Sequence, residues 1–201
     1  MGVLVGREAP DFTASAVLGN GEIVENYTLS GAIKGKNAVL FFYPLDFTFV
    51  CPSELIAFDH RIEAFKKRNV EVIGVSIDSQ FTHNAWRNTP INEGGIGPVK
   101  YTLVADMNHA ICQAYDVETL DGNVAFRGSF LIDAKGVVRH QVVNDLPLGR
   151  NVDEMLRMVD ALAFHEEHGE VCPAGWTQGD KGMKDTPDGV ASYLSENADK
   201  L

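Results

Sequence analysis

Cysteine is scarce in this chain, which has three, Cys51, Cys112 and Cys172, among 201 residues. An odd, widely spaced set excludes the disulfide framework of a small secreted protein. None of them belongs to a CxxC pair, and no group of cysteines and histidines has zinc-ligand spacing, so we expect no metal and no cofactor. Each cysteine is therefore either a small buried apolar residue or a thiol with redox or nucleophilic chemistry.

Basic residues are also few, with 17 Lys and Arg against 28 Asp and Glu and a net charge of -11. This excess of negative charge disfavours nucleic acid and anionic membrane surfaces as partners. The strongest apolar run, residues 38–43, is far shorter than the roughly 20 residues of a membrane-spanning helix. Residues 1–12 show no basic region followed by an apolar core, so we expect a cytoplasmic protein.

The apolar pattern predicts an α/β fold. Residues 38–43 and 70–75 are short apolar runs typical of buried strands. Between them, apolar residues recur at three- and four-residue steps, which predicts one amphipathic helix and a parallel strand pair. Residues 102–105, 129–133 and 137–143 are further predicted strands, the last two forming an antiparallel hairpin, so the sheet is mixed.

The C-terminal part changes in composition. Apolar residues from Val152 to Leu162 predict a helix that Gly169 ends in a left-handed conformation. Residues 175–189 are rich in Gly, Asp and Lys and predict an irregular arm. We therefore expect one main domain over residues 1–168 and an arm over residues 169–201 that carries Cys172.

Cys51 stands at a predicted helix start, because Pro52 follows it and proline is favoured in the first helical turn. The free N–H groups of Ser53 and Glu54 and the helix dipole would favour a negative charge on sulfur. The dipole alone contributes only about 0.3–1 kcal/mol, so a cationic neighbour is also required. Thr48 could turn its hydroxyl toward the sulfur, and Pro44 removes one backbone donor.

This pattern, PLDFTFVCPSE over residues 44–54, resembles the active-site signature of the peroxiredoxins. Similar stretches are SIDSQFTHNAW at 76–86, FRGSFLID at 126–133 and GEVCPAGW at 169–176, so the resemblance covers nearly the whole chain. Within that family, these stretches resemble those of the typical two-cysteine peroxiredoxins, which are related to the alkyl hydroperoxide reductase C subunits.

The resemblance implies a thioredoxin-like fold, with a central mixed sheet flanked by helices and an irregular C-terminal arm. It implies that Cys51 attacks hydrogen peroxide or an alkyl hydroperoxide and becomes a sulfenic acid. Cys172 of a partner subunit then forms a disulfide with it, which thioredoxin or a dedicated flavoprotein reduces. A homodimer, and a decamer of five dimers, are implied as well. The residues implied to complete or support the pocket are Thr48, Arg127, Pro44, Glu54 and Arg150.

Two segments concern overoxidation in the family, a Gly-Gly-Leu-Gly loop and a C-terminal Tyr-Phe pair. This chain has Gly94, Gly95, Ile96 and Gly97 in the first and Tyr193 and Leu194 in the second. Both matches are imperfect. Because Cys51 must unwind from its helix to reach Cys172, and resistance to unwinding exposes it to more peroxide, we predict intermediate sensitivity.

Other functions use the same residues. A redox-controlled chaperone or a peroxide sensor would also oxidise Cys51, but would not clear peroxide. A disulfide reductase is disfavoured, because Glu54 occupies the place of the second cysteine of a CxxC motif. His83 and His109 are interpreted as structural hydrogen-bonding groups rather than catalytic bases. The preferred peroxide and the reductant stay open.

Overall fold

The computed structural model describes residues 2–201, and the chain forms two compact units, Met1–Val152 and Asp153–Leu201. Each unit is described by itself. The expected division of roles between residues 1–168 and 169–201 stays a prediction.

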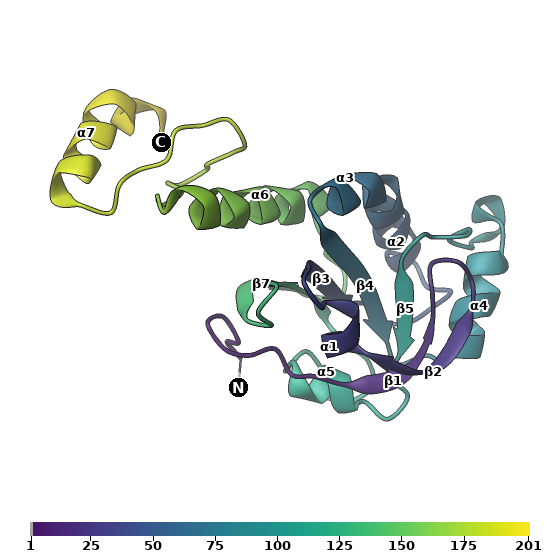
Figure 1. Ribbon diagram of the computed structural model, residues 1–201. Coiled ribbons are helices and arrows are strands. Elements are labelled where there is room, and N and C mark those ends of the chain that lie inside the picture. Colours follow the sequence, from purple (N-terminus) through teal and green to yellow (C-terminus); the bar gives the residue numbers. More distant parts are fainter. Residues whose placement is uncertain (1) are drawn as a thin grey trace. The chain divides into compact units, whose positions relative to one another are not determined.

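The first unit is built on one mixed sheet of seven strands in the order β2-β1-β5-β4-β3-β6-β7. Figure 1 shows β3, β4 and β5 at its centre. Strands β3, β4 and β5 are parallel, whereas β1, β2, β6 and β7 join their neighbours antiparallel. The bounds are β1 Thr13–Val17, β2 Ile23–Thr28, β3 Asn37–Phe42, β4 Val70–Ser76, β5 Thr102–Ala105, β6 Arg127–Ile132 and β7 Val138–Asn144.

The mixed sheet, the parallel pair β3 and β4, and the hairpin of β6 and β7 confirm the predictions from sequence. Strands β1 and β2 were not predicted. Both lie toward one edge of the sheet and are only partly buried, so their sequences lack the continuous apolar run that marks the central strands.

Helices cover both faces of the sheet (Figure 1). Successive side chains of β3 point to opposite faces. Phe41 stacks on Phe58 with ring centroids 4.1 Å apart, whereas Phe42 lies 5.2 Å from the ring of Tyr115. Helix α2 is therefore on one face and α5 on the other. The helices of this unit are α1 Leu29–Ala32, α2 Cys51–His60, α3 Ile62–Lys67, α4 Gln80–Asn88 and α5 Ala110–Ala114, with a 3-10 turn η1 at Ile91–Glu93.

The prediction of a single helix between β3 and β4 was wrong in one respect. The structure has two helices there, α2 and α3, which are separated at Arg61. The Arg61 guanidinium donates to the Ala57 carbonyl at 3.2 Å. The Arg61 backbone N–H bonds instead to the Phe58 carbonyl at 3.1 Å, three residues back. A side chain that takes the i−4 carbonyl thus replaces one helical turn with a tighter one.

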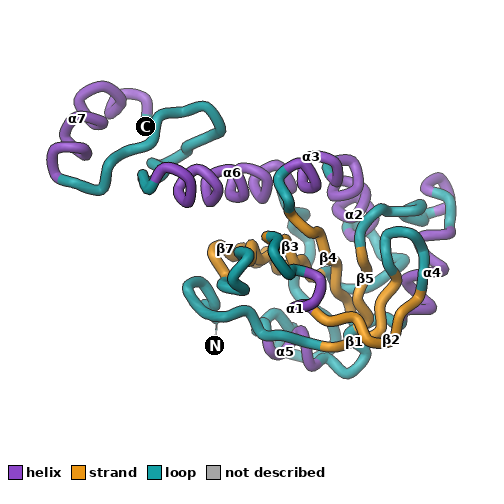
Figure 2. Tube along the Cα trace, viewed as in Figure 1, coloured by secondary structure: helices purple, strands orange, loops and turns teal. Residues whose placement is uncertain are grey.

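The second unit begins with α6, Val152–His168, whose end at Gly169 with φ +67° confirms the predicted left-handed cap. A loop then follows, as Figure 2 shows, with a bridge between Val171 and Met183. The arm is not irregular throughout. Helix α7, Pro187–Asn197, begins where the Thr186 side chain accepts from the Gly189 N–H, and the 3-10 turn η2, Ala198–Lys200, follows it.

Candidate active site

Cys51 is the first residue of α2 and follows the loop that leaves β3. Its side chain is buried, with 1% of the residue exposed. Val50 is the N-cap and gives no side-chain hydrogen bond, and Pro52 occupies the second helical position. The prediction that Cys51 lies at the start of a helix is therefore confirmed.

The expectation that the Ser53 and Glu54 N–H groups are free was wrong. They donate to the Val50 carbonyl at 3.1 and 3.4 Å, so the first turn already uses them. Charge on the sulfur is then influenced by the helix dipole and by side chains around the thiol rather than by these two donors.

Thr48 lies beside the thiol, with Oγ1 3.1 Å from Cys51 Sγ and 2.7 Å from the Leu45 carbonyl oxygen. A hydroxyl has one proton, so it can donate to only one of these acceptors at a time. Thr48 is thus a donor that can be redirected within the loop. Pro44, at the beginning of the same loop, is buried.

Arg127, the first residue of β6, supplies the cation that the sequence argument required. Its Nη1 lies 3.4 Å from Cys51 Sγ and 2.6 Å from Glu54 Oε2, and only 4% of the side chain is exposed. Its Nε donates to the Leu146 carbonyl at 2.7 Å. Charge-assisted contacts on both sides fix the guanidinium against the sulfur.

Glu54 holds two arginines. Its Oε1 accepts from Nε and from the backbone N–H of Arg150, both at 2.9 Å, and its Oε2 accepts from Arg150 Nη2 at 2.9 Å. Burial alone would raise the pKa of Glu54, but the hydrogen bonds and charge of Arg150, with the charge of Arg127, hold that pKa below its usual value. Glu54 is therefore ionised at neutral pH.

Arg150 also connects this site to the sheet. Its Nη1 donates to the carbonyl oxygens of Phe42 and Gly128 at 2.7 and 2.8 Å, and its guanidinium lies over the Phe41 ring at 5.1 Å. These acceptors could not be identified from sequence, because backbone carbonyls carry no residue signature. They fix Arg150, and through Glu54 they fix Arg127.

Cys172 lies in the second unit, where its Sγ donates to the Ala161 carbonyl at 3.4 Å. Burial raises the pKa of the Cys172 thiol above its usual value, and the nearby charge of Arg157 partly opposes this. Cys51 and the five residues predicted to complete or support its pocket all lie in the first unit.

The predicted regulatory residues are divided between the two units. Gly94 and Gly97 have φ of +85° and +68°, a conformation that favours glycine, and the Trp86 Nε1 donates to the Gly94 carbonyl at 2.9 Å. Ile96, in the same loop, is buried. Tyr193 and Leu194 belong to α7, where Leu194 is 41% exposed.

A buried polar cluster supports the loop that carries Thr48, and sequence reasoning did not find it. Asp46 accepts from the Tyr43 hydroxyl at 2.8 Å and lies 2.7 Å from His83 Nδ1, and the side chains of Asp46 and His83 are both fully buried. The Asp46 N–H donates to Asp78 Oδ2 at 2.9 Å. His83 is thus a structural hydrogen-bonding group, as predicted, and so is His109, which lies 2.6 Å from Glu118. The only available signal was the position of Asp46 inside the motif.

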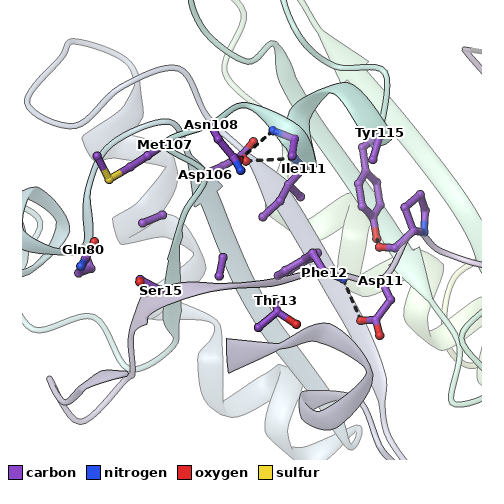
Figure 3. Close-up of a pocket in the computed structure, with 15 residues that line it drawn as sticks. Asp11, Phe12, Thr13, Ser15, Gln80, Asp106, Met107, Asn108, Ile111 and Tyr115 are labelled. Carbon is purple, nitrogen blue, oxygen red and sulfur yellow. Dashed lines mark hydrogen bonds between the residues drawn. The ribbon is translucent and has the colours of Figure 1, made fainter. Parts of the chain in front are cut away.

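Cys112 and the cavity near it lie apart from this site. The cavity, about 450 Å³, is lined by residues of the β1 segment, the end of β5 and α5 (Figure 3). Asp106 accepts there from the Ile111 and Cys112 N–H groups at 3.0 and 2.7 Å. Burial raises the pKa of Cys112 well above its usual value, and the hydrogen bond and negative charge of Asp106 raise it further. This thiol therefore stays protonated.

Within residues 2–201, no cluster of three or more His, Cys, Asp or Glu side chains could hold a metal ion. No helix in the described part of the chain is long and apolar enough to cross a membrane.

Comparisons with known proteins give matches along nearly the whole chain. A model described as the AhpC/TSA family matches residues 5–141, and one described as the C-terminal domain of 1-Cys peroxiredoxin matches residues 161–196. Alkyl hydroperoxide reductase C of Helicobacter pylori is 59% identical over 199 residues, 99% of this chain and 100% of that protein. Peroxiredoxin-2 of Mus musculus is 54% identical, over 96% of each chain.

The solved structures give the same result for the fold. The crystal structure of reduced 2-Cys peroxiredoxin from Plasmodium vivax matches with a TM-score of 0.93 and 50% identity, covering 96% of this chain and 99% of that one. The thioredoxin-like fold predicted from sequence is thereby confirmed. With one family model covering residues 5–141 and relatives above 50% identity along almost the whole length, this chain belongs to the AhpC/TSA family of peroxiredoxins.

Proposed function

We propose that this chain is a thiol-dependent peroxidase that reduces hydroperoxides with Cys51. The observation that carries the proposal is the position of the buried Cys51 Sγ between two donors, Thr48 Oγ1 at 3.1 Å and Arg127 Nη1 at 3.4 Å. Relatives named alkyl hydroperoxide reductase C and peroxiredoxin-2 support the same chemistry.

In the first step the Cys51 thiolate attacks one oxygen of the peroxide, an S–O bond forms and the O–O bond breaks. The departing oxygen takes a proton and leaves as water or an alcohol, and Cys51 becomes a sulfenic acid. Negative charge moves from sulfur to the departing oxygen. The Thr48 hydroxyl can turn toward that oxygen and the Arg127 guanidinium is held beside the sulfur, so both donors stabilise the transition state.

In the second step Cys172 attacks the sulfenic sulfur, a disulfide forms and water is released. Cys51 is buried, so the start of α2 must unwind first. Its first turn rests on one bond of 3.1 Å and one of 3.4 Å to the Val50 carbonyl. Glu54, bound to two arginines, opposes further unwinding.

The remaining roles are inferred from the family and from exposed groups. We propose thioredoxin or a dedicated flavoprotein as reductant, and a homodimer that assembles further to a decamer. Phe47 and Phe49 are 51% and 97% exposed beside the site, and large exposed aromatic side chains favour a subunit interface. We propose a cytoplasmic location, because three widely spaced cysteines are too few for the disulfide framework of a secreted protein.

A peroxidase assay of Cys51→Ser and Cys172→Ser with each candidate reductant tests this function. Cys51→Ser should abolish rapid reaction with hydrogen peroxide. Cys172→Ser should keep that reaction but lose turnover with thioredoxin. Rapid peroxide reaction in Cys51→Ser would overturn the role of Cys51, and full turnover in Cys172→Ser would overturn that of Cys172.

The alternative of a sensor or chaperone is not favoured. A sensor would be oxidised once per thiol, whereas a peroxidase turns over steadily in the presence of a reductant. The names of the relatives describe peroxide-reducing enzymes. The same assay separates the two functions.

A further inference from the structure

The segment that carries Cys172 lies along one face of α6. Arg157 Nη1 donates to the Trp176 carbonyl at 2.8 Å, and the Ala161 carbonyl accepts from Cys172 Sγ at 3.4 Å. The Phe164 ring lies 4.9 Å from the Trp176 ring. Positions 157, 161 and 164 are spaced by four and three residues and so share a helix face.

The Arg157 side chain is also held by a partner on its own helix. Its Nε and Nη2 each donate to a different oxygen of Glu154, both at 2.7 Å, in a bidentate pair on the same helix. The remaining nitrogen, Nη1, is the one that reaches Trp176. The cation is thus oriented toward the Cys172 segment by a carboxylate that does not contact the thiol.

Several other titratable groups of this unit have partners of their own. On α6, His165 Nδ1 lies 2.8 Å from the Glu170 carbonyl. In the arm, Asp180 accepts from Thr177, and Lys181 pairs with Glu196 of α7 at 3.2 Å. Among the described residues, Arg157 is the charged group whose electrostatic effect on Cys172 opposes that of burial.

We propose that Arg157 is a positioning residue for the second step of the reaction. It holds the Cys172 segment on α6 through the Trp176 carbonyl and stabilises the anionic sulfur that attacks Cys51. The proposal rests on the proposed function, in which Cys172 resolves the sulfenic acid. It adds a residue that acts on the resolving thiol alone.

The chemistry of the step explains why a cation matters there. Cys172 loses its proton, its thiolate attacks the Cys51 sulfenic sulfur, the S–S bond forms and the S–O bond breaks. The departing hydroxide takes up a proton, so the net product besides the disulfide is one water. Only the thiolate is an effective nucleophile, so below the pKa of the thiol the rate follows the ionised fraction.

The test is a single-turnover measurement of disulfide formation after one equivalent of hydrogen peroxide, from pH 6 to pH 10. Arg157→Met keeps the apolar stem and removes the charge, and Arg157→Lys restores the charge without the bidentate pair. We expect Arg157→Met to be about three- to tenfold slower near pH 7, because each pKa unit changes the thiolate fraction about tenfold. The difference should shrink at the highest pH, where the thiolate forms without the cation.

Arg157→Lys should recover most of the rate near neutral pH. Lys181→Met, which removes a charge that is 80% exposed in the same unit, should match the unchanged protein. The first step, oxidation of Cys51, should be equally fast in all variants.

Two results would overturn the proposal. One is an unchanged rate in Arg157→Met at every pH, and the other is a slowing by the same factor at every pH, which would mean that Arg157 only supports the fold. Failure of the proposed function has a different signature. Peptide mapping of the unchanged protein would then find no disulfide between Cys51 and Cys172.

Discussion

Arg127 Nη1 contacts Cys51 Sγ at 3.4 Å and Glu54 Oε2 at 2.6 Å, so one nitrogen joins the thiol to a buried carboxylate. Glu54 is also the partner of Arg150, which bonds to the ends of β3 and β6. Two cations and one anion leave a net positive charge beside the sulfur. The first two predictions follow from this arrangement.

Replacing Glu54 with Gln should slow the reaction with peroxide and destabilise the fold. Both arginines would remain buried without an anion, and breaking a buried ion pair in this way costs about 3 kcal/mol. Denaturant unfolding and the stopped-flow rate of Cys51 oxidation measure the two effects. Glu63→Gln is the matched control, because Glu63 is 68% exposed and pairs with Lys66 on the surface. Equal stability of the two variants would contradict the prediction.

The stabilising effect of Glu54 should depend on pH in a definite direction. Its pKa is lower in the folded chain than the usual value of 4.5, so its contribution is fully present above pH 4.5 and is lost as pH falls through the folded pKa. The difference in unfolding free energy between the unchanged protein and Glu54→Gln should be constant from pH 6 to 8 and shrink below 4.5. A difference that grows on acidification would contradict it.

The Thr48 hydroxyl should contribute to the first step as a donor. Thr48→Val removes it at nearly constant volume, and the loss of one preorganised donor costs about a hundredfold in rate. Thr48→Ser keeps the donor to Cys51 Sγ and to the Leu45 carbonyl, and should retain most of the activity. The rate of peroxide consumption is the measurement. Similar rates in the Val and Ser variants would show that the hydroxyl is not used.

The sequence predicted the central strands and the place of Cys51 at a helix start beside Thr48, because both leave local patterns. Residues 38–43 are apolar throughout, and the peroxiredoxin signature places Thr48 and Cys51 three residues apart. Contacts that depend on the backbone left no such pattern. The Ala57 carbonyl that breaks the helix at Arg61 and the Phe42 and Gly128 carbonyls that hold Arg150 could be found only in three dimensions. The same limit explains the wrong expectation for the Ser53 and Glu54 N–H groups.

Residues 100 and 101, which follow the loop of residues 94–97, bond to α2 at two points. The Tyr101 hydroxyl donates to the Leu55 carbonyl at 2.8 Å, and the Lys100 N–H donates to Asp59 Oδ1 at 2.8 Å. Both contacts hold α2 beyond its first turn, so they oppose unwinding that extends past that turn. They stabilise the folded helix and so prolong the time in which the sulfenic acid can meet a second peroxide.

Tyr101→Phe should therefore lower the sensitivity of Cys51 to overoxidation. Removing this buried hydrogen bond costs about 1 kcal/mol, which raises the population of the opened α2 about fivefold if the effect is local. Mass measurement under rising peroxide should find less Cys51 sulfinic acid than in the unchanged protein, whose sensitivity we predict to be intermediate. Hydrogen exchange of α2 amides should be faster in the variant. Tyr115→Phe, which removes a hydroxyl bond of 3.0 Å to the Pro10 carbonyl on the other face of the sheet, serves as the control. More sulfinic acid in Tyr101→Phe, or faster exchange without any change in sulfinic acid, would show that this contact does not govern the competition.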